Sequence, residues 1–131
     1  MADESIEYYT PGKSVTGHAT AAVTGKRFVR ITGNRVGGNI AVAHAAAGAD
    51  VVGVTMQTKP LGAKVGLHVT PGAVVPVTAS GAIPAGASVV STADGRAIVA
   101  GAGVPACGKC WDGAADGEDA MIQLLPHSTA V

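Results

Sequence analysis

Short apolar runs, cut by Gly, Pro, Asn and Asp, recur along the whole chain. The runs are rich in Val, Ile and Thr, which β-strands prefer. Several alternate, so that Val65, Leu67 and Val69 would face one side of a strand. Period-two patterning is typical of strands with one buried face. The pattern predicts strands over residues 14–18, 28–32, 39–43, 51–56, 64–69, 74–79, 88–92, 96–100 and 120–125.

Turn-forming residues separate the predicted strands, because they supply a positive or preset φ at a bend. The clearest hairpin is centred on Asp94-Gly95, which lies between two apolar runs. The one stretch with a helical composition, residues 41–49, is short and contains Gly48, so a loop or a single turn fits it equally well. Further turns are predicted at Gly33-Asn34, Gly37-Gly38-Asn39, Pro60-Leu61-Gly62, Pro71-Gly72, Pro84-Ala85-Gly86 and Asp116-Gly117.

Closely spaced strands with no helices between them indicate an all-β sandwich or barrel. The length of 131 residues suits a single small domain. We therefore predict a β-barrel domain over residues 14–125, an extended N-terminal arm over residues 1–13 and a C-terminal tail over residues 126–131.

The composition predicts a thin core. Gly and Ala together supply 44 residues, and only four residues are aromatic. Small side chains bury little apolar area, at about 25 cal/mol per Å². Additional burial against other copies of the chain would compensate for such a core.

The formal charge is zero, with nine basic and nine acidic residues. A neutral chain gives no general argument for nucleic-acid binding. The charges are nevertheless uneven, because residues 13–64 hold seven cations and one anion, whereas residues 112–119 hold four anions and no cation. These blocks are either two solvated stretches or complementary patches that meet a partner.

No targeting or membrane segment is expected. The acidic start, Met-Ala-Asp-Glu-Ser, lacks the basic and apolar regions of a signal peptide. No run reaches the 18 or so apolar residues of a membrane span. We expect a protein made in a cytosol, where thiols stay reduced.

Catalytic and cofactor motifs are not supported. The Gly12-Lys13-Ser14 triplet ends like a phosphate-binding loop, but Glu7 stands where the first glycine belongs and no helix is predicted to follow. The nucleophile and zinc-protease motifs are not found. We predict that the chain is not an enzyme and needs no cofactor.

Cys107 and Cys110 form a single C-x-x-C pair. A structural zinc site needs four ligands, and the four histidines are not spaced as a ligand pair. If the segment is a strand, the two thiols face opposite sides and do not pair easily. Two reduced, small apolar residues are the favoured interpretation, with metal binding as the alternative.

The aromatic residues are candidates for contacts with a partner. Trp111 fills the core or anchors an interface between subunits, where Trp is enriched. Tyr8 and Tyr9 are adjacent on a predicted extended arm, so both cannot enter one core face. One or both are expected to meet a partner.

The sequence resembles the capsid decoration (cement) proteins of tailed bacteriophages. The resemblance covers nearly the whole chain, and the cysteine pair departs from it. It begins in the most specific block, Tyr8-Tyr9-Thr10-Pro11-Gly12 with residues 15–29, and continues in order through Gly33-Asn34, Gly53-Val54, residues 81–86, residues 94–97 and residues 114–120.

The resemblance implies a β-tulip-like barrel and a structural role. Such proteins bind the outer surface of the phage head, often as trimers, and bridge coat subunits. The implied partners are the major capsid protein and copies of the chain itself, and the implied location is the virion surface after assembly in the bacterial cytoplasm. The alternative is a head-surface or fibre-like domain that binds host glycans.

The resemblance also implies a role for the N-terminal arm. In similar proteins the N-terminal arm adds a strand to the coat protein, a known mode of recognition. The expected coat contacts are Ile6, Tyr8, Tyr9, Pro11 and Lys13, and the expected contacts between subunits are Arg27, Phe28, Arg30 and Trp111.

Overall fold

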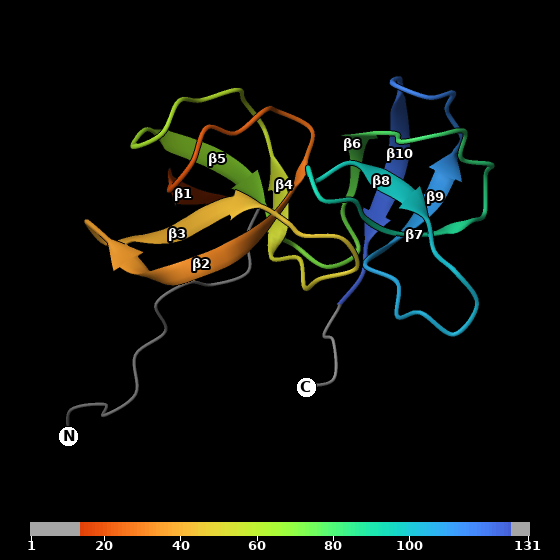
Figure 1. Ribbon diagram of the computed structural model, residues 1–131, viewed down its shortest axis with the longest axis horizontal. Coiled ribbons are helices and arrows are strands. Elements are labelled where there is room, and N and C mark those ends of the chain that lie inside the picture. Colours follow the sequence, from red (N-terminus) through yellow and green to blue (C-terminus); the bar gives the residue numbers. More distant parts are fainter. Residues whose placement is uncertain (1–13, 127–131) are drawn as a thin grey trace.

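A computed structural model describes residues 14–126, and every regular element in this range is a β-strand. The prediction of an all-β fold is confirmed (Figure 1). The strands are β1 (Val15–Ala19), β2 (Phe28–Val36), β3 (Asn39–His44), β4 (Gly53–Thr55), β5 (Lys64–His68), β6 (Val74–Thr78), β7 (Ser88–Ser91), β8 (Ala97–Val99), β9 (Gly108–Asp112) and β10 (Asp119–Leu124).

The first five strands close into a small barrel in the order β1-β3-β2-β4-β5. Antiparallel pairing of β1 with β5 completes the circle, with Val15 opposite Leu67. The β1–β3 pair is parallel, and the other neighbours in the barrel are antiparallel. The closed barrel therefore occupies only the first half of the described chain.

The last five strands form a second, antiparallel sheet in the order β6-β10-β9-β7-β8. The hairpin of β7 and β8 turns at the predicted Asp94-Gly95 site. Beyond β6, Ala79 bridges Ala97 of β8, and the Ser80 N–H donates to the Ala97 carbonyl at 2.7 Å. The segment after β6 thus lies along β8 and partly covers this edge of the sheet.

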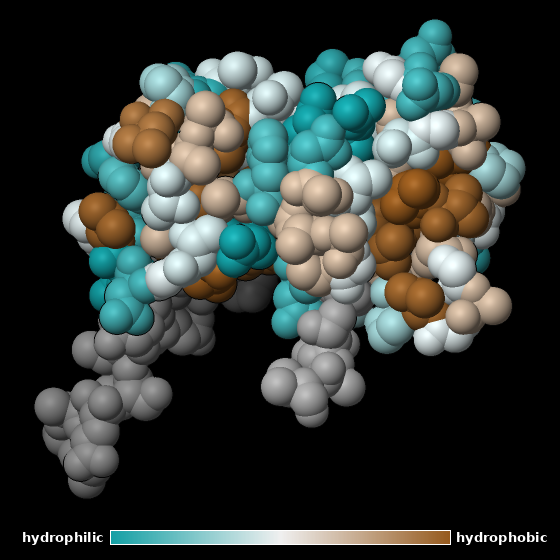
Figure 2. All heavy atoms as spheres, viewed as in Figure 1, coloured by the Kyte–Doolittle hydropathy of each residue, from teal (hydrophilic) through white to brown (hydrophobic). Residues whose placement is uncertain are grey.

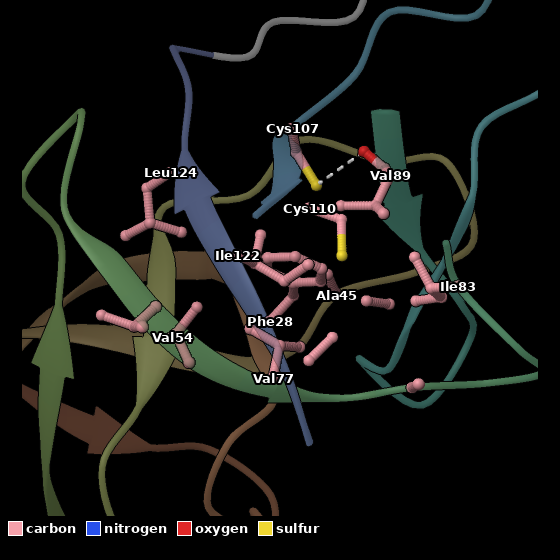
Figure 3. Close-up of a cluster of buried hydrophobic side chains, with 14 residues drawn as sticks. Phe28, Ala45, Val54, Val77, Ile83, Val89, Cys107, Cys110, Ile122 and Leu124 are labelled. Carbon is pink, nitrogen blue, oxygen red and sulfur yellow. Dashed lines mark hydrogen bonds between the residues drawn. The ribbon is translucent and has the colours of Figure 1, made fainter. Parts of the chain in front are cut away.

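One hydrophobic cluster joins the two sheets into a single domain. It contains Phe28 and Val54 from the barrel together with Val77, Val89 and Ile122 from the second sheet (Figure 3). A separate cluster, which includes Val29 and Leu67, fills the barrel. Because successive residues of a strand face opposite sides, the start of β2 sends Phe28 into one cluster and Val29 into the other.

Alternation predicted the buried faces correctly. Val65 and Leu67 are buried while their neighbours are more exposed, and in β10 Ala120, Ile122 and Leu124 are buried while Met121 is exposed. These strands have one face on a core and one on solvent.

Two local predictions were wrong, and one open alternative is decided by the structure. Gly33-Asn34 does not turn the chain, because β2 continues to Val36 through irregular pairing and the turn lies at Gly37-Gly38. The helix considered for residues 41–49 does not form, because the start of this stretch belongs to β3 and the rest is the loop and turn of the alternative interpretation. Residues 108–112, which were not predicted as a strand, form β9 between β10 and β7.

The predicted arm, with Ile6, Tyr8, Tyr9, Pro11 and Lys13, lies outside the described residues, as does the tail from residue 127 onward. The domain boundaries proposed from the sequence therefore stay predictions.

Candidate interaction surfaces

Trp111 and Met121 stand on the outward face of the second sheet, where they are 56% and 46% exposed. Met121 lies opposite Pro76 of β6 and Asp112 of β9, and the exposed Pro76 extends the apolar strip across a third strand. The Trp111 indole N–H donates to the side-chain carbonyl of Gln123 at 3.3 Å, which orients the ring. An oriented, half-exposed tryptophan on a rigid sheet is a candidate contact point.

A second apolar patch covers the β8 edge and the loop that follows it. Ile98, Val99 and Val104 are exposed by 40%, 43% and 44%. Figure 2 shows a hydrophobic area over β8 and the neighbouring loop. Contiguous exposed apolar residues mark binding sites more often than scattered ones do.

A third surface feature is an open groove of about 490 Å³ beside β2. Its size lies in the range of ligand-binding clefts, about 300–1,000 Å³. A smaller hollow of about 90 Å³ shares Val51 and Val52 with it and reaches Leu124 and Pro126. The groove itself is lined by Arg30, Ile31, Ala49, Asp50, Val51 and Val52.

The four residues expected between subunits lie in different environments. Trp111 and Arg30 are exposed on different sheets, so both are accessible to a partner. Phe28 is fully buried in the chain's own core, which removes it from the set of surface contacts. Arg27 is 18% exposed and bonds within the chain, so it joins the two sheets of one copy.

The turn between β7 and β8 is anchored on the start of β2. The Arg27 guanidinium donates to the Asp94 carbonyl at 3.1 Å, and the Phe28 N–H donates to the Gly95 carbonyl at 2.7 Å. The Thr92 hydroxyl and the Arg96 guanidinium both donate to the Asp94 carboxylate. The Thr92 bond, followed by Arg96, lowers the pKa of Asp94 from 3.8 to about 2.

Lys26 makes a second link between the sheets and is the one non-glycine residue with positive φ (61°) in the part of the chain that the structure describes. Its carbonyl accepts the Thr78 N–H at 3.0 Å, and its ammonium lies 2.6 Å from the Asp119 carboxylate. A left-handed lysine is sterically unfavourable. These contacts with β6 and β10 hold it in place.

Cys107 and Cys110 are both reduced and buried in the shared core (Figure 3). The expectation that the thiols would face opposite sides assumed that both lie in one strand, but Cys107 precedes β9 and only Cys110 lies within it. Burial raises the pKa of Cys107 to about 12 and also raises the pKa of Cys110. Neither thiol has the low pKa of a reactive cysteine.

Residues 14–126 hold no group of three or more His, Cys, Asp or Glu side chains placed to bind a metal ion. No helix in this range is long and apolar enough to cross a membrane.

No protein-family model matches the chain, and no curated protein is significantly similar to it. A similar solved structure is the N base of the head fibre gp8.5 of bacteriophage phi29, with a TM-score of 0.74 and 19% sequence identity. The match covers 90% of this chain and 98% of that chain. At this identity the likeness concerns the fold alone, so the resemblance to decoration proteins stays a prediction.

Sequence reasoning missed the apolar patch on β8 and the groove beside β2. The exposed Ile98 and Val99 belong to a short run of consecutive apolar residues, 97–100, that resembles a buried strand. The groove is built from two segments, residues 30–31 and 49–52, which only the barrel brings together. No local feature of the sequence indicates that these two segments lie side by side.

Proposed function

We propose that this chain is a non-enzymatic structural protein of a tailed-phage head and binds the head's outer surface. The observation that carries the proposal is the fold shared with the base of a phage head fibre over nearly the whole of both chains. The ordered resemblance of the sequence to decoration proteins points independently to the same part of the virion.

The distribution of apolar surface is compatible with this role. Trp111 and Met121 lie on one face of the second sheet, and Ile98, Val99 and Val104 lie on the β8 edge. Exposed aromatic and aliphatic residues on a rigid sheet are typical anchors of protein interfaces. We propose that one of these surfaces contacts the major capsid protein and that the other contacts a neighbouring copy in a trimer.

The finer role that we propose is that of a cement protein that bridges coat subunits and stabilises the head. The N-terminal arm contributes to attachment, with Ile6, Tyr8, Tyr9, Pro11 and Lys13 as the coat-contacting residues. An extended segment with adjacent aromatic residues suits the addition of a strand to a partner's sheet. Such a contact gains affinity from main-chain hydrogen bonds and specificity from alternate side chains.

Co-sedimentation with undecorated heads tests the proposal. We expect the full chain to sediment with heads and to raise the temperature at which they release DNA. Deletion of residues 2–13 should abolish sedimentation while the far-ultraviolet circular dichroism of the β-domain is preserved. Deletion of residues 127–131 is the matched control, because it also shortens a terminus.

The outcomes separate the two parts of this proposal. Sedimentation of the arm-deleted protein at the full level would show that the arm is not the coat contact. If the full chain fails to bind undecorated heads of any tailed phage tested, the head-surface role itself is wrong.

The alternative is a glycan-binding domain on a head appendage, and one observation favours it. Trp111 is exposed, fixed by Gln123 and close in sequence to the exposed Lys109, so an apolar platform stands beside polar groups. Binding of the isolated protein to a glycan array, lost in Trp111→Ala, would support this function over capsid attachment.

A further inference from the structure

The β4-facing edge of β2 loses its partner after Val29. The ladder between the two strands holds only Phe28 with Val54 and Val29 with Gly53, and the Val29 carbonyl then accepts the Val52 N–H at 2.9 Å. Within residues 14–126, no strand or isolated bridge continues along this edge. Because backbone groups alternate between the two edges of a strand, Ile31 directs its N–H and C=O to the same side as Val29.

The groove beside β2 begins at this unpaired edge. Arg30 and Ile31 form one wall, and residues 49–52 form the other. Ile31 is 54% exposed, and Val51 and Val52 are only partly buried. After Ile31 the pairing of β2 with β3 becomes irregular. The regular part of the β4-facing edge of β2 is therefore the part that lies next to the groove. This combination of a bare edge and apolar walls fits an extended peptide.

The charges of the chain indicate which peptide suits the groove. Residues 15–68, which build the barrel, hold six cations and one anion. Residues 2–9 have the sequence ADESIEYY, with three anions and no cation. In an extended segment Ile6 and Tyr8 fall on one side and Glu7 on the other, so one side is apolar and the other acidic. Its apolar side matches Val51 and Val52. Two of the barrel's cations, Lys26 and Arg27, pair with carboxylates of the second half of the chain, and the barrel's one anion, Asp50, lines the groove together with Arg30. The acidic residues of the segment therefore match the net positive charge of the barrel around the groove, with Arg30 as the cation in the groove itself.

The connecting residues are long enough to reach the groove. β2 lies two positions from β1 in the barrel order, a path of about 10 Å at about 4.8 Å per strand. Five residues, 9–13, span at most about 17 Å when extended. A tethered segment also has a high effective concentration, in the millimolar range for short links, so modest contacts are sufficient.

We propose that residues 2–9 of the same chain dock in this groove and add a strand to the β2 edge at Ile31. The occupant is thus the chain's own N-terminal segment. The docked segment shields an edge that would otherwise pair with other chains. Where the arm also serves head attachment, which rests on the proposed function, it must leave the groove before it binds the coat.

Amide hydrogen exchange of the isolated protein, followed residue by residue by NMR without heads, tests the docking. We expect the Ile31 amide to exchange about tenfold or more slowly in the full chain than after deletion of residues 2–9, which corresponds to about 1.4 kcal/mol of protection. A synthetic peptide of residues 1–10 should restore the protection to the deleted protein. Ile31→Glu should weaken binding of this peptide, because the new carboxylate meets an acidic segment in the groove.

Met121→Glu is the matched control, since it places the same charge on an exposed apolar site of the other sheet. It should leave peptide binding unchanged. Equal exchange of the Ile31 amide with and without residues 2–9 would overturn the proposal. Docking between copies would give a different result: the mass in solution would double or triple only when residues 2–9 are present, and the protection of the Ile31 amide would fall on dilution. That result would also overturn the proposal. Because no head is used, these outcomes are independent of capsid attachment.

Discussion

Replacing Gly95 by Ala should destabilise the protein far more than the same change at Gly117, although both glycines have a φ of +80°. An L-residue in the left-handed region costs about 1–2 kcal/mol, and this cost applies to both sites. At Gly117 a new Cβ meets no atom within 4 Å. At Gly95 it falls 2.5 Å from the Phe28 carbonyl oxygen, a backbone atom that cannot rotate away.

The extra cost at Gly95 follows from the contact that must open. The turn has to move away from β2, which weakens the 2.7 Å bond from the Phe28 N–H to the Gly95 carbonyl. A backbone hydrogen bond contributes about 0.5–1.5 kcal/mol net, and displaced packing against a core adds about 1–3 kcal/mol. We therefore expect losses of about 1–2 kcal/mol for Gly117→Ala and about 2.5–6.5 kcal/mol for Gly95→Ala.

Urea denaturation followed by Trp111 fluorescence and by circular dichroism measures both variants. The two probes should give one transition in the unmodified protein, because the clusters on both sides of β2 unfold together. Equal losses for the two variants would refute the reasoning that the turn is locked onto β2. If Trp111 fluorescence and circular dichroism report two separate unfolding transitions, the two halves do not share one core.

Three further predictions concern charge, thiols and the exposed tryptophan. The pKa of Asp94 is about 2 in the folded chain against 3.8 for the ordinary side chain. The ionised carboxylate therefore stabilises the fold above pH 4, and this stabilisation is lost as the pH falls toward 2. Asp94→Asn should flatten the dependence of the urea midpoint on pH in this range. Cys107 and Cys110 should not react with a thiol reagent at pH 8 until denaturant unfolds the chain, since both are buried and their pKa values are raised; rapid labelling of the native protein would contradict their burial. Trp111→Ala should change the free energy of unfolding by no more than about 0.5–1 kcal/mol, because the ring is 56% exposed, yet weaken head binding in the co-sedimentation assay; a large loss of stability would assign the ring to the core.

The strands that sequence analysis found are those in which side-chain alternation and β-propensity agree. β5 and β10 show both, and their buried faces follow the pattern residue by residue. β9 has low β-propensity, because Gly108, Lys109 and Asp112 are poor strand formers. It is a strand because β10 and β7 pair with it on both sides, which is a tertiary effect.

Phe28 shows why surface residues are harder to predict than strands. Two adjacent apolar residues on a strand cannot both face one core, so a single barrel would leave one of the pair Phe28 and Val29 outside its core. The structure has a core on each side of this strand, and both Phe28 and Val29 are fully buried. The spacing of the predicted strands does not indicate that the later strands form a second sheet packed against the outside of the barrel.

The same arrangement bears on how the protein could bridge two partners. A bridge resists load only if its two contact surfaces keep a fixed relation to each other. Here the barrel and the second sheet share the Phe28 cluster and are also tied by the Lys26 and Arg27 contacts at the start of β2. An interface inside one chain that is large and apolar does not hinge readily. The apolar surfaces on β8 and β9 are therefore held at a fixed orientation to the β2 edge, so a pull on either half is transmitted through the core to the other.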